Sequence, residues 1–135
     1  MSSWSKSLIK LASYEVETLQ KRLSEVVDRR VAAQQRLARL LAEAEAEIAN
    51  AAADDDAAMS LSAYLDGLRL RKAAIQSEIE TILAEEAGAR DALAEAFEAQ
   101  KKYEQVAESA RLLEVKEAGR RETAALDELG LRKAR

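Results

Sequence analysis

The chain has 135 residues, of which 48% are hydrophobic and 34% charged, and its formal net charge is −4. It contains no His, Cys or Pro, which excludes imidazole catalysis, thiolate chemistry and cysteine-ligated zinc sites. Helix-forming Ala, Glu, Leu, Arg and Lys dominate, so the composition indicates long helices or a coiled coil rather than a thick globular core.

A first helix is predicted at about residues 4–52. Apolar residues recur there with alternating spacings of three and four, interrupted by one charged residue, which indicates a left-handed supercoil with a partner helix. This first seam consists of Ile9, Ala12, Val16, Leu19, Leu23, Val26, Arg30, Ala33, Leu37, Leu40 and Ala44.

A turn is predicted at about residues 53–61. Asp54, Asp55 and Asp56 are consecutive and Ser60 follows; Asp and Ser side chains compete for backbone hydrogen bonds and favour turns and helix N-caps. We therefore expect the chain to reverse near Asp55. The alternative is one unbroken helix through this Ala-rich stretch.

A second helix is predicted at about residues 62–130, with a less regular seam. Its members are Tyr64 or Leu65, Leu68, Ile75, Ile79, Ile82, Ala89, Leu93, Ala96 or Phe97, Tyr103, and Val106 or Ala107. If the chain reverses near Asp55, this seam faces the first one and Leu37 lies near Ile75. The predicted fold is all-α, a single domain over 1–135: a long, elongated two-helix antiparallel coiled-coil hairpin with an overhanging C-terminal helix.

Arg30 and Glu86 are the charged residues of the two seams, and the antiparallel alignment brings them within one helical turn. We therefore predict an interhelical ion pair. Polar seam pairs of this kind set the register of a coiled coil more often than they add stability.

The segment after about Glu108 extends past the first helix in this alignment. It carries apolar side chains that another protein must cover, or the segment stays partly frayed: Leu112, Leu113, Val115, Leu126, Leu129 and Leu131. Residues 1–40 hold eight basic and four acidic residues, residues 41–110 six and sixteen, and residues 111–135 seven and five. The hairpin would thus be basic where its termini meet and acidic toward its turn, a polarity that orients it against partners of opposite charge.

The sequence lacks the motifs of enzymes and ligand sites. Its four glycines are isolated, so no phosphate-binding loop is present, and the adjacent Asp54–Asp56 do not have the alternating oxygens of a calcium loop. We expect no enzyme activity, cofactor or metal. Acidity and mixed charges argue against nucleic-acid binding and direct membrane binding, and no stretch is apolar enough to span a bilayer.

The chain resembles the FliJ family of flagellar export components. The resemblance rests on Leu8 and Leu11 in the first turns, the long hairpin pattern and a series of C-terminal pieces: Lys102–Tyr103, Leu112–Leu113, Arg120-Arg121-Glu122 and Ala125-Leu126-Asp127-Glu128-Leu129 before a basic tail. It implies a cytoplasmic, non-enzymatic part of the flagellar type III export apparatus at the cytoplasmic face of the inner membrane. Its implied partners are the export ATPase, which it binds as a central stalk, the membrane export gate and export chaperones, so any membrane association is through partners.

Under this resemblance the C-terminal end contacts the ATPase through Leu112, Leu113, Arg120, Arg121, Arg132 and Lys133. Tyr64, Leu68 and Leu70 cannot all enter one seam, so Tyr64 or Leu70 is expected to contribute to a second surface near the turn, with the export gate as its candidate partner. Two alternatives remain open. The chain is the stalk of a virulence type III secretion system, or it is a homodimeric coiled-coil scaffold joined through its C-terminal helices.

Overall fold

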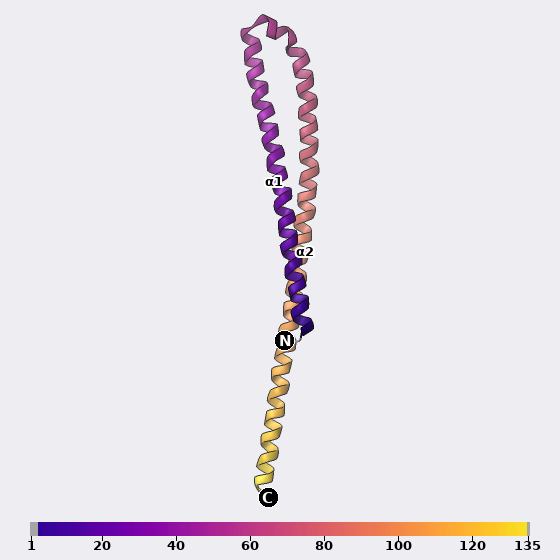
Figure 1. Ribbon diagram of the computed structural model, residues 1–135, viewed down its shortest axis with the longest axis vertical. Helices are drawn as coiled ribbons and strands as arrows, with labels where there is room; N and C mark the ends of the chain where they lie inside the picture. Colours follow the sequence, from indigo (N-terminus) through magenta and orange to yellow (C-terminus); the bar gives the residue numbers. More distant parts are fainter. Residues whose placement is uncertain (1–2, 135) are drawn as a thin grey trace. The chain divides into compact units, whose positions relative to one another are not determined.

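The computed structural model describes residues 3–134 and consists of two helices, α1 (Ser3–Ala53) and α2 (Asp55–Ala134) (Figure 1). The predicted all-α hairpin of two packed helices is confirmed. The internal contacts divide the chain into two units, which are described separately. The turn unit is Leu19–Ala92, and the terminal unit comprises residues 3–18 of α1 and 93–134 of α2.

The turn is shorter than the predicted 53–61, because residues 55–61 already belong to α2. Asp54, the one described residue outside the helices, acts as the N-cap: its Oδ1 accepts a hydrogen bond from the Asp56 backbone N–H at 3.1 Å, and its carbonyl accepts one from the Ala58 N–H at 3.0 Å. Asp55 and Asp56 fall in the first turn, where the helix dipole favours negative charge. The Asp run therefore starts a helix instead of forming a loop, and the alternative of an unbroken helix is wrong.

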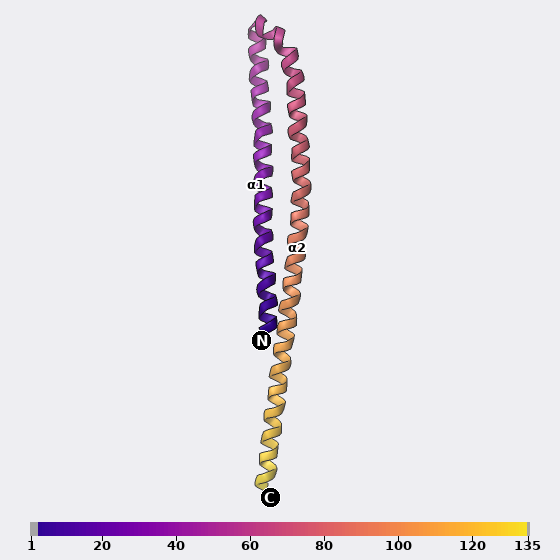
Figure 2. The ribbon, with the colours of Figure 1, turned by 45° about the vertical axis from the view of Figure 1, so that its right-hand side comes forward.

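Within the turn unit, α1 and α2 run antiparallel and side by side in both ribbon views (Figures 1 and 2). The first turns of α2 cross over from the end of α1 before the helix runs back along it. The core centres on Val26, Ala33 and Ile82, against which Ile79 packs. All of these are residues of the two predicted seams.

The seam positions of α1 are buried or half-buried along the whole helix, including Arg30. Leu37 lines the same shallow recess as Gln76 and Ile79, within about one turn of the expected neighbour Ile75. The seven-residue repeat in the sequence thus identified the face of α1 that packs against α2.

In the terminal unit, α1 packs on α2 through small side chains. Ala12 and Val16 on α1 and Ala96 and Ala107 on α2 are buried, as is Ser5. Where the sequence left two choices, the structure buries Ala96 rather than Phe97 and Ala107 rather than Val106. Beyond residue 110 every described residue of α2 is exposed, which is the overhanging helix predicted from the sequence.

Candidate partner-binding surfaces

Arg30 and Glu86 form an ion pair across the two helices of the turn unit. The Arg30 Nε lies 2.5 Å from the Glu86 Oε1, and the two side chains are only 24% and 12% exposed. The hydrogen bond from Arg30, followed by that from Arg90, lowers the pKa of Glu86 against the opposing effect of desolvation. This pair aligns α1 with α2 and is not itself placed to meet a partner.

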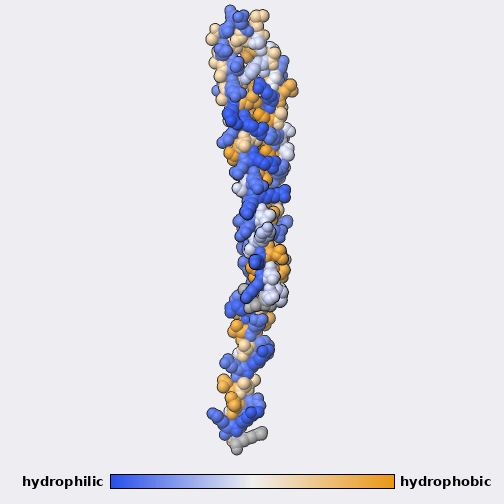
Figure 3. Space-filling model, viewed as in Figure 1, coloured by the Kyte–Doolittle hydropathy of each residue, from blue (hydrophilic) through white to orange (hydrophobic). Residues whose placement is uncertain are grey.

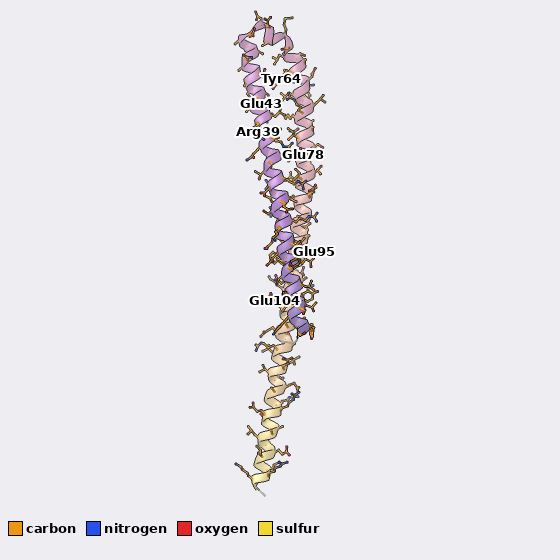
Figure 4. The ribbon with its side chains drawn as sticks, viewed as in Figure 1. Arg39, Glu43, Tyr64, Glu78, Glu95 and Glu104 are labelled. Carbon is orange, nitrogen blue, oxygen red and sulfur yellow. The ribbon has the colours of Figure 1, made fainter. Side chains whose placement is uncertain are left out.

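Two more exposed ion pairs cross between the helices, Arg29–Glu85 at 2.7 Å and Arg36–Glu78 at 2.6 Å. Glu78 projects from α2 on the side of α1 (Figure 4). The hydrogen bond from Arg29 lowers the pKa of Glu85. Sequence reasoning did not identify these pairs, although the antiparallel alignment that matched Arg30 with Glu86 places both of them in register.

Tyr64 and Leu70, the two candidates near the turn, have different environments. Tyr64 is half-buried on the α1 side of α2, and the Arg71 guanidinium lies 5.7 Å from the centre of its ring (Figure 4). Leu70 is 74% exposed. Because six residues turn a helix by about 240°, the two side chains do not form one surface.

Met59, which is 87% exposed, is a further apolar residue near the turn. Eleven residues are about three helical turns, so Met59 lies on the same face of α2 as Leu70. Residue 59 falls in the turn predicted from the sequence, so this face was not expected. The eleven-residue spacing is the signal that would have revealed it.

The C-terminal segment 111–134 exposes large apolar side chains among charged ones, as the lower part of Figure 3 shows. Exposed fractions range from 53% for Leu129 to 68% for Leu131. Leu112, Val115, Leu126 and Leu129 share one face of α2, which we call the C-terminal stripe. The segment is therefore an amphipathic helix whose apolar face no described residue of α1 covers.

The six residues expected at the ATPase end do not share one face of this helix. Leu112 and Lys133 lie on the stripe, whereas the other four residues are each turned from its centre by roughly a third of the circumference: Leu113 and Arg120 to one side, Arg121 and Arg132 to the other. Arg120 and Arg132 pair within the helix, with Glu117 at 3.4 Å and Glu128 at 3.1 Å. Val115, Leu126 and Leu129 complete the apolar face and were left out of the expected ATPase contacts.

The start of α1 in the terminal unit carries a second exposed apolar surface. Leu8, Leu11 and Tyr14 line an open recess together with Tyr103 of α2, and Leu11 and Tyr14 are 66% and 70% exposed. Tyr103 is thus at the edge of the seam, 39% exposed, rather than inside it. The spacing of three between Leu8, Leu11 and Tyr14, off the seam, is the sequence signal of this surface.

The terminal unit is not basic overall. Residues 1–18 and 93–135 contain eleven Lys and Arg and eleven Asp and Glu. Acidic residues of α2 in this unit, among them Glu95 and Glu104 (Figure 4), offset the lysines of the unit in number. Positive charge in this unit is therefore local, in patches such as Arg120 and Arg121.

Over residues 3–134 the structure contains no group of three or more acidic, His or Cys side chains arranged to hold a metal ion. Neither helix, over the same range, has a stretch long and apolar enough to cross a membrane. What the described surface offers is apolar and charged helix faces, the kind of surface that other proteins bind.

No protein-family model and no solved structure matches this chain. Two curated proteins do, both named flagellar FliJ protein, from Caulobacter vibrioides strains NA1000 / CB15N and ATCC 19089 / CIP 103742 / CB 15. Each is 50% identical over 134 residues, which cover 99% of this chain and 96% of the relative. At this identity over nearly the full length of both chains, the protein belongs to the FliJ family of flagellar proteins.

Proposed function

We propose that this protein is a non-enzymatic component of the flagellar type III export apparatus whose C-terminal segment binds the export ATPase as a stalk. The observation that carries the proposal is the exposed segment 111–134, with its apolar stripe, in a chain of the FliJ family. When a partner buries the uncovered apolar face of a helix, the free energy of the system falls and the complex is stabilised. The cavity of an ATPase ring is an environment that can surround a single helix.

The proposal places the protein in the cytoplasm, at the cytoplasmic face of the inner membrane, through its partners. The export gate is proposed to contact the outer face near the turn formed by Met59 and Leu70, which are 87% and 74% exposed. Tyr64 is better suited to packing, because it is half-buried beneath Arg71. Export chaperones are proposed to bind the remaining apolar surface at Leu8, Leu11 and Tyr14.

Of the two alternatives, a virulence secretion stalk is disfavoured because both curated relatives carry a flagellar name. A homodimeric scaffold differs from an ATPase stalk in its partner, although both use the C-terminal segment. The two are separated by measuring binding to the purified export ATPase.

Removal of residues 111–135 tests the stalk assignment. The truncated chain should lose binding to the export ATPase and stimulation of its turnover. Its thermal unfolding should stay close to that of the full chain, because every described residue of the removed segment is exposed. Full stimulation by the truncated chain would refute the assignment.

Charge reversal tests the basic contribution to this contact. Arg120→Glu together with Arg121→Glu should weaken ATPase binding more at low salt than at high salt, where screening already suppresses the attraction. The matched control is Arg69→Glu with Lys72→Glu, which makes the same charge change on an exposed part of α2 in the turn unit. Equal loss from both pairs would mean that net charge, and not the C-terminal site, governs binding.

The turn-end contact is tested with Leu70→Ala and Met59→Ala. These variants should reduce gate binding and swimming while melting like the parent, because both side chains are largely exposed. Tyr64→Ala is the comparison, and it should lower the melting temperature because Tyr64 is half-buried. Wild-type gate binding and motility in the Leu70 and Met59 variants would remove this face from the proposal.

A further inference from the structure

The C-terminal stripe does not continue the seam that packs against α1. In the terminal unit the covered face of α2 passes through Ala96, Gln100, Ala107 and Ala110, all buried or half-buried. The same spacing of three and four continues after Ala110 to charged residues: Glu114, Glu117 and Arg121. At about 100° per residue, the centre of the stripe is turned by roughly a quarter of the circumference or more from the centre of the covered face, so the stripe is a different face of α2.

The spacing of the stripe indicates what does cover it. Its positions alternate by three and four through Leu112, Val115, Gly119, Glu122, Leu126 and Leu129. A repeat of seven residues keeps one face in contact with a supercoiled partner helix. The partner is therefore a helix that packs along the stripe.

The stripe is complementary to itself when two copies run antiparallel. In that arrangement Leu112 of one copy faces Leu129 of the other, and Val115 faces Leu126, so apolar layers form at both ends. The middle layers pair Glu122 with Gly119. Glycine adds no side chain to this layer, which leaves room for the Glu122 carboxylate of the other copy to bend toward water.

A parallel pair is disfavoured by like charges. It would place the Glu122 carboxylates of the two copies opposite each other within the seam, and Arg111 of one copy beside Lys116 of the other. In the antiparallel pair the cations that meet at the ends are Arg111 and Arg132. Each is already neutralised in its own helix, by Glu108 at 2.7 Å and Glu128 at 3.1 Å.

Small residues on the stripe also favour close approach of a second helix. Gly119 sits in an exposed helix, where glycine costs up to about 1 kcal/mol relative to alanine, and no neighbouring side chain in the chain requires it. Ala118 and Ala125 flank the seam and would face each other across the antiparallel pair. We propose that residues 111–134 form an antiparallel coiled coil with the same segment of a second copy of this chain.

The chain contains no cysteine, so single cysteines report the pairing directly. Leu112→Cys protein mixed with Leu129→Cys protein under mild oxidation should give a mixed covalent dimer, while each variant alone should give little. The matched control is Leu113→Cys mixed with Leu131→Cys, which lie off the stripe and should remain monomeric. Efficient self-cross-linking of Leu112→Cys, or equal cross-linking of the control pair, would overturn the antiparallel arrangement.

Sedimentation equilibrium of the full chain provides the second measurement. The wild type should show a reversible monomer–dimer equilibrium, and Leu126→Glu should shift it to monomer. Leu131→Glu, with the same change on an equally exposed leucine off the stripe, should behave as wild type, and circular dichroism should report equal helicity for both. A wild type that stays monomeric up to high concentration would reject the dimer.

The dimer does not rest on the proposed ATPase contact, because both measurements use the chain alone. If both proposals hold, the stripe is shared, and the ATPase must displace one copy to bind the other. Leu126→Glu then loses both partners, whereas Arg120→Glu with Arg121→Glu, off the stripe, weakens ATPase binding and leaves dimerisation unchanged. If the chain dimerises but does not bind the ATPase, the proposed function is refuted and the dimer is still supported.

Discussion

The turn unit and the terminal unit share a repeat but differ in what the repeat buries. The turn unit has the aliphatic cluster of Val26 and Ile82 around Ala33, which is 0% exposed, and three ion pairs join its helices. The terminal unit buries mostly Ala, and a hydrogen bond of 2.9 Å from Gln100 Nε2 to Ser13 Oγ links its helices. Periodicity therefore fixes which face packs, whereas side-chain volume and charge decide how firmly it packs.

The difference in buried apolar area bears on how easily each unit opens to a partner. Regions with little buried apolar area open at low cost in free energy, and such regions are the ones available for exchange between partners. The turn unit is built to hold two helices together. The terminal unit, with its thin seam and exposed stripe, is where the proposed partners would compete for one surface.

The largest expected effect comes from truncating the core of the turn unit. Ile82→Ala removes a side chain that is 3% exposed and should cost about 2–4 kcal/mol in the free energy of unfolding. Val16→Ala in the terminal unit removes two methyl groups and should cost roughly 1.5 kcal/mol, at about 0.8 for each buried carbon. Urea denaturation of both variants measures the difference.

The control for this pair is Leu131→Ala, whose side chain is 68% exposed and should leave unfolding unchanged. Equal costs for Ile82→Ala and Val16→Ala would contradict the stated contrast between the two units.

The next largest effect is expected from low pH, which should destabilise the turn unit more than the terminal unit. The pKa values of Glu85 and Glu86 are lowered by hydrogen bonds from Arg29 and Arg30, so the stability they contribute is complete above the ordinary glutamate pKa of 4.5. That contribution is lost as pH falls through the lowered pKa values of the folded protein. Packing across the terminal unit rests on Ala12, Val16 and a neutral hydrogen bond, so it should change little.

Thermal unfolding between neutral and acidic pH, followed at labelled positions in each unit, measures this effect. Glu85→Gln with Glu86→Gln should be less stable at neutral pH and should lose much of the acid sensitivity. An acid response that survives unchanged in this variant would assign it to other carboxylates.

The smallest effects are expected at two exposed helical glycines. A Cβ built at Gly88 or at Gly119 meets nothing within 4 Å, so alanine fits at both. Gly88→Ala should raise the free energy of unfolding by up to about 1 kcal/mol, because it removes backbone freedom from the unfolded chain. The melting temperature should rise accordingly. Gly119→Ala should instead raise the helicity of the C-terminal segment and leave the melting of the turn unit unchanged, since that segment packs on no described part of the chain. A melting increase as large for Gly119→Ala as for Gly88→Ala would show that the C-terminal segment shares in the cooperative unfolding of the turn unit.

Much of the fold followed from local rules. A seven-residue repeat is visible in the sequence alone, so the two seams could be predicted. Together with the reversal near Asp54–Asp56, the seams also predicted that Arg30 and Glu86 lie close to each other. The turn was predicted too long because the propensity of Asp for turns and its propensity for helix N-caps give the same sequence signal. Only the backbone arrangement shows that Asp54 caps a helix that begins at once.

The candidate surfaces were less predictable, because they depend on rotation about the helix axis relative to a partner. Exposure of the segment after residue 110 follows from the unequal lengths of the two predicted helices. The sequence could not say that Tyr64 packs beneath Arg71 while Leu70 points away, since either could occupy the seam. It also grouped Leu112 with Leu113 and the arginines, although these side chains occupy different faces.

The sequence by itself determined that the chain forms two antiparallel helices, because the repeat and the absence of proline leave few other ways to bury its apolar residues. The tertiary structure decided which of two adjacent residues enters the seam, Ala96 over Phe97 and Ala107 over Val106. It also decided that the C-terminal stripe lies on a different face of α2 from the seam. Both depend on where α1 lies against α2, and that position is set by contacts between residues far apart in the chain.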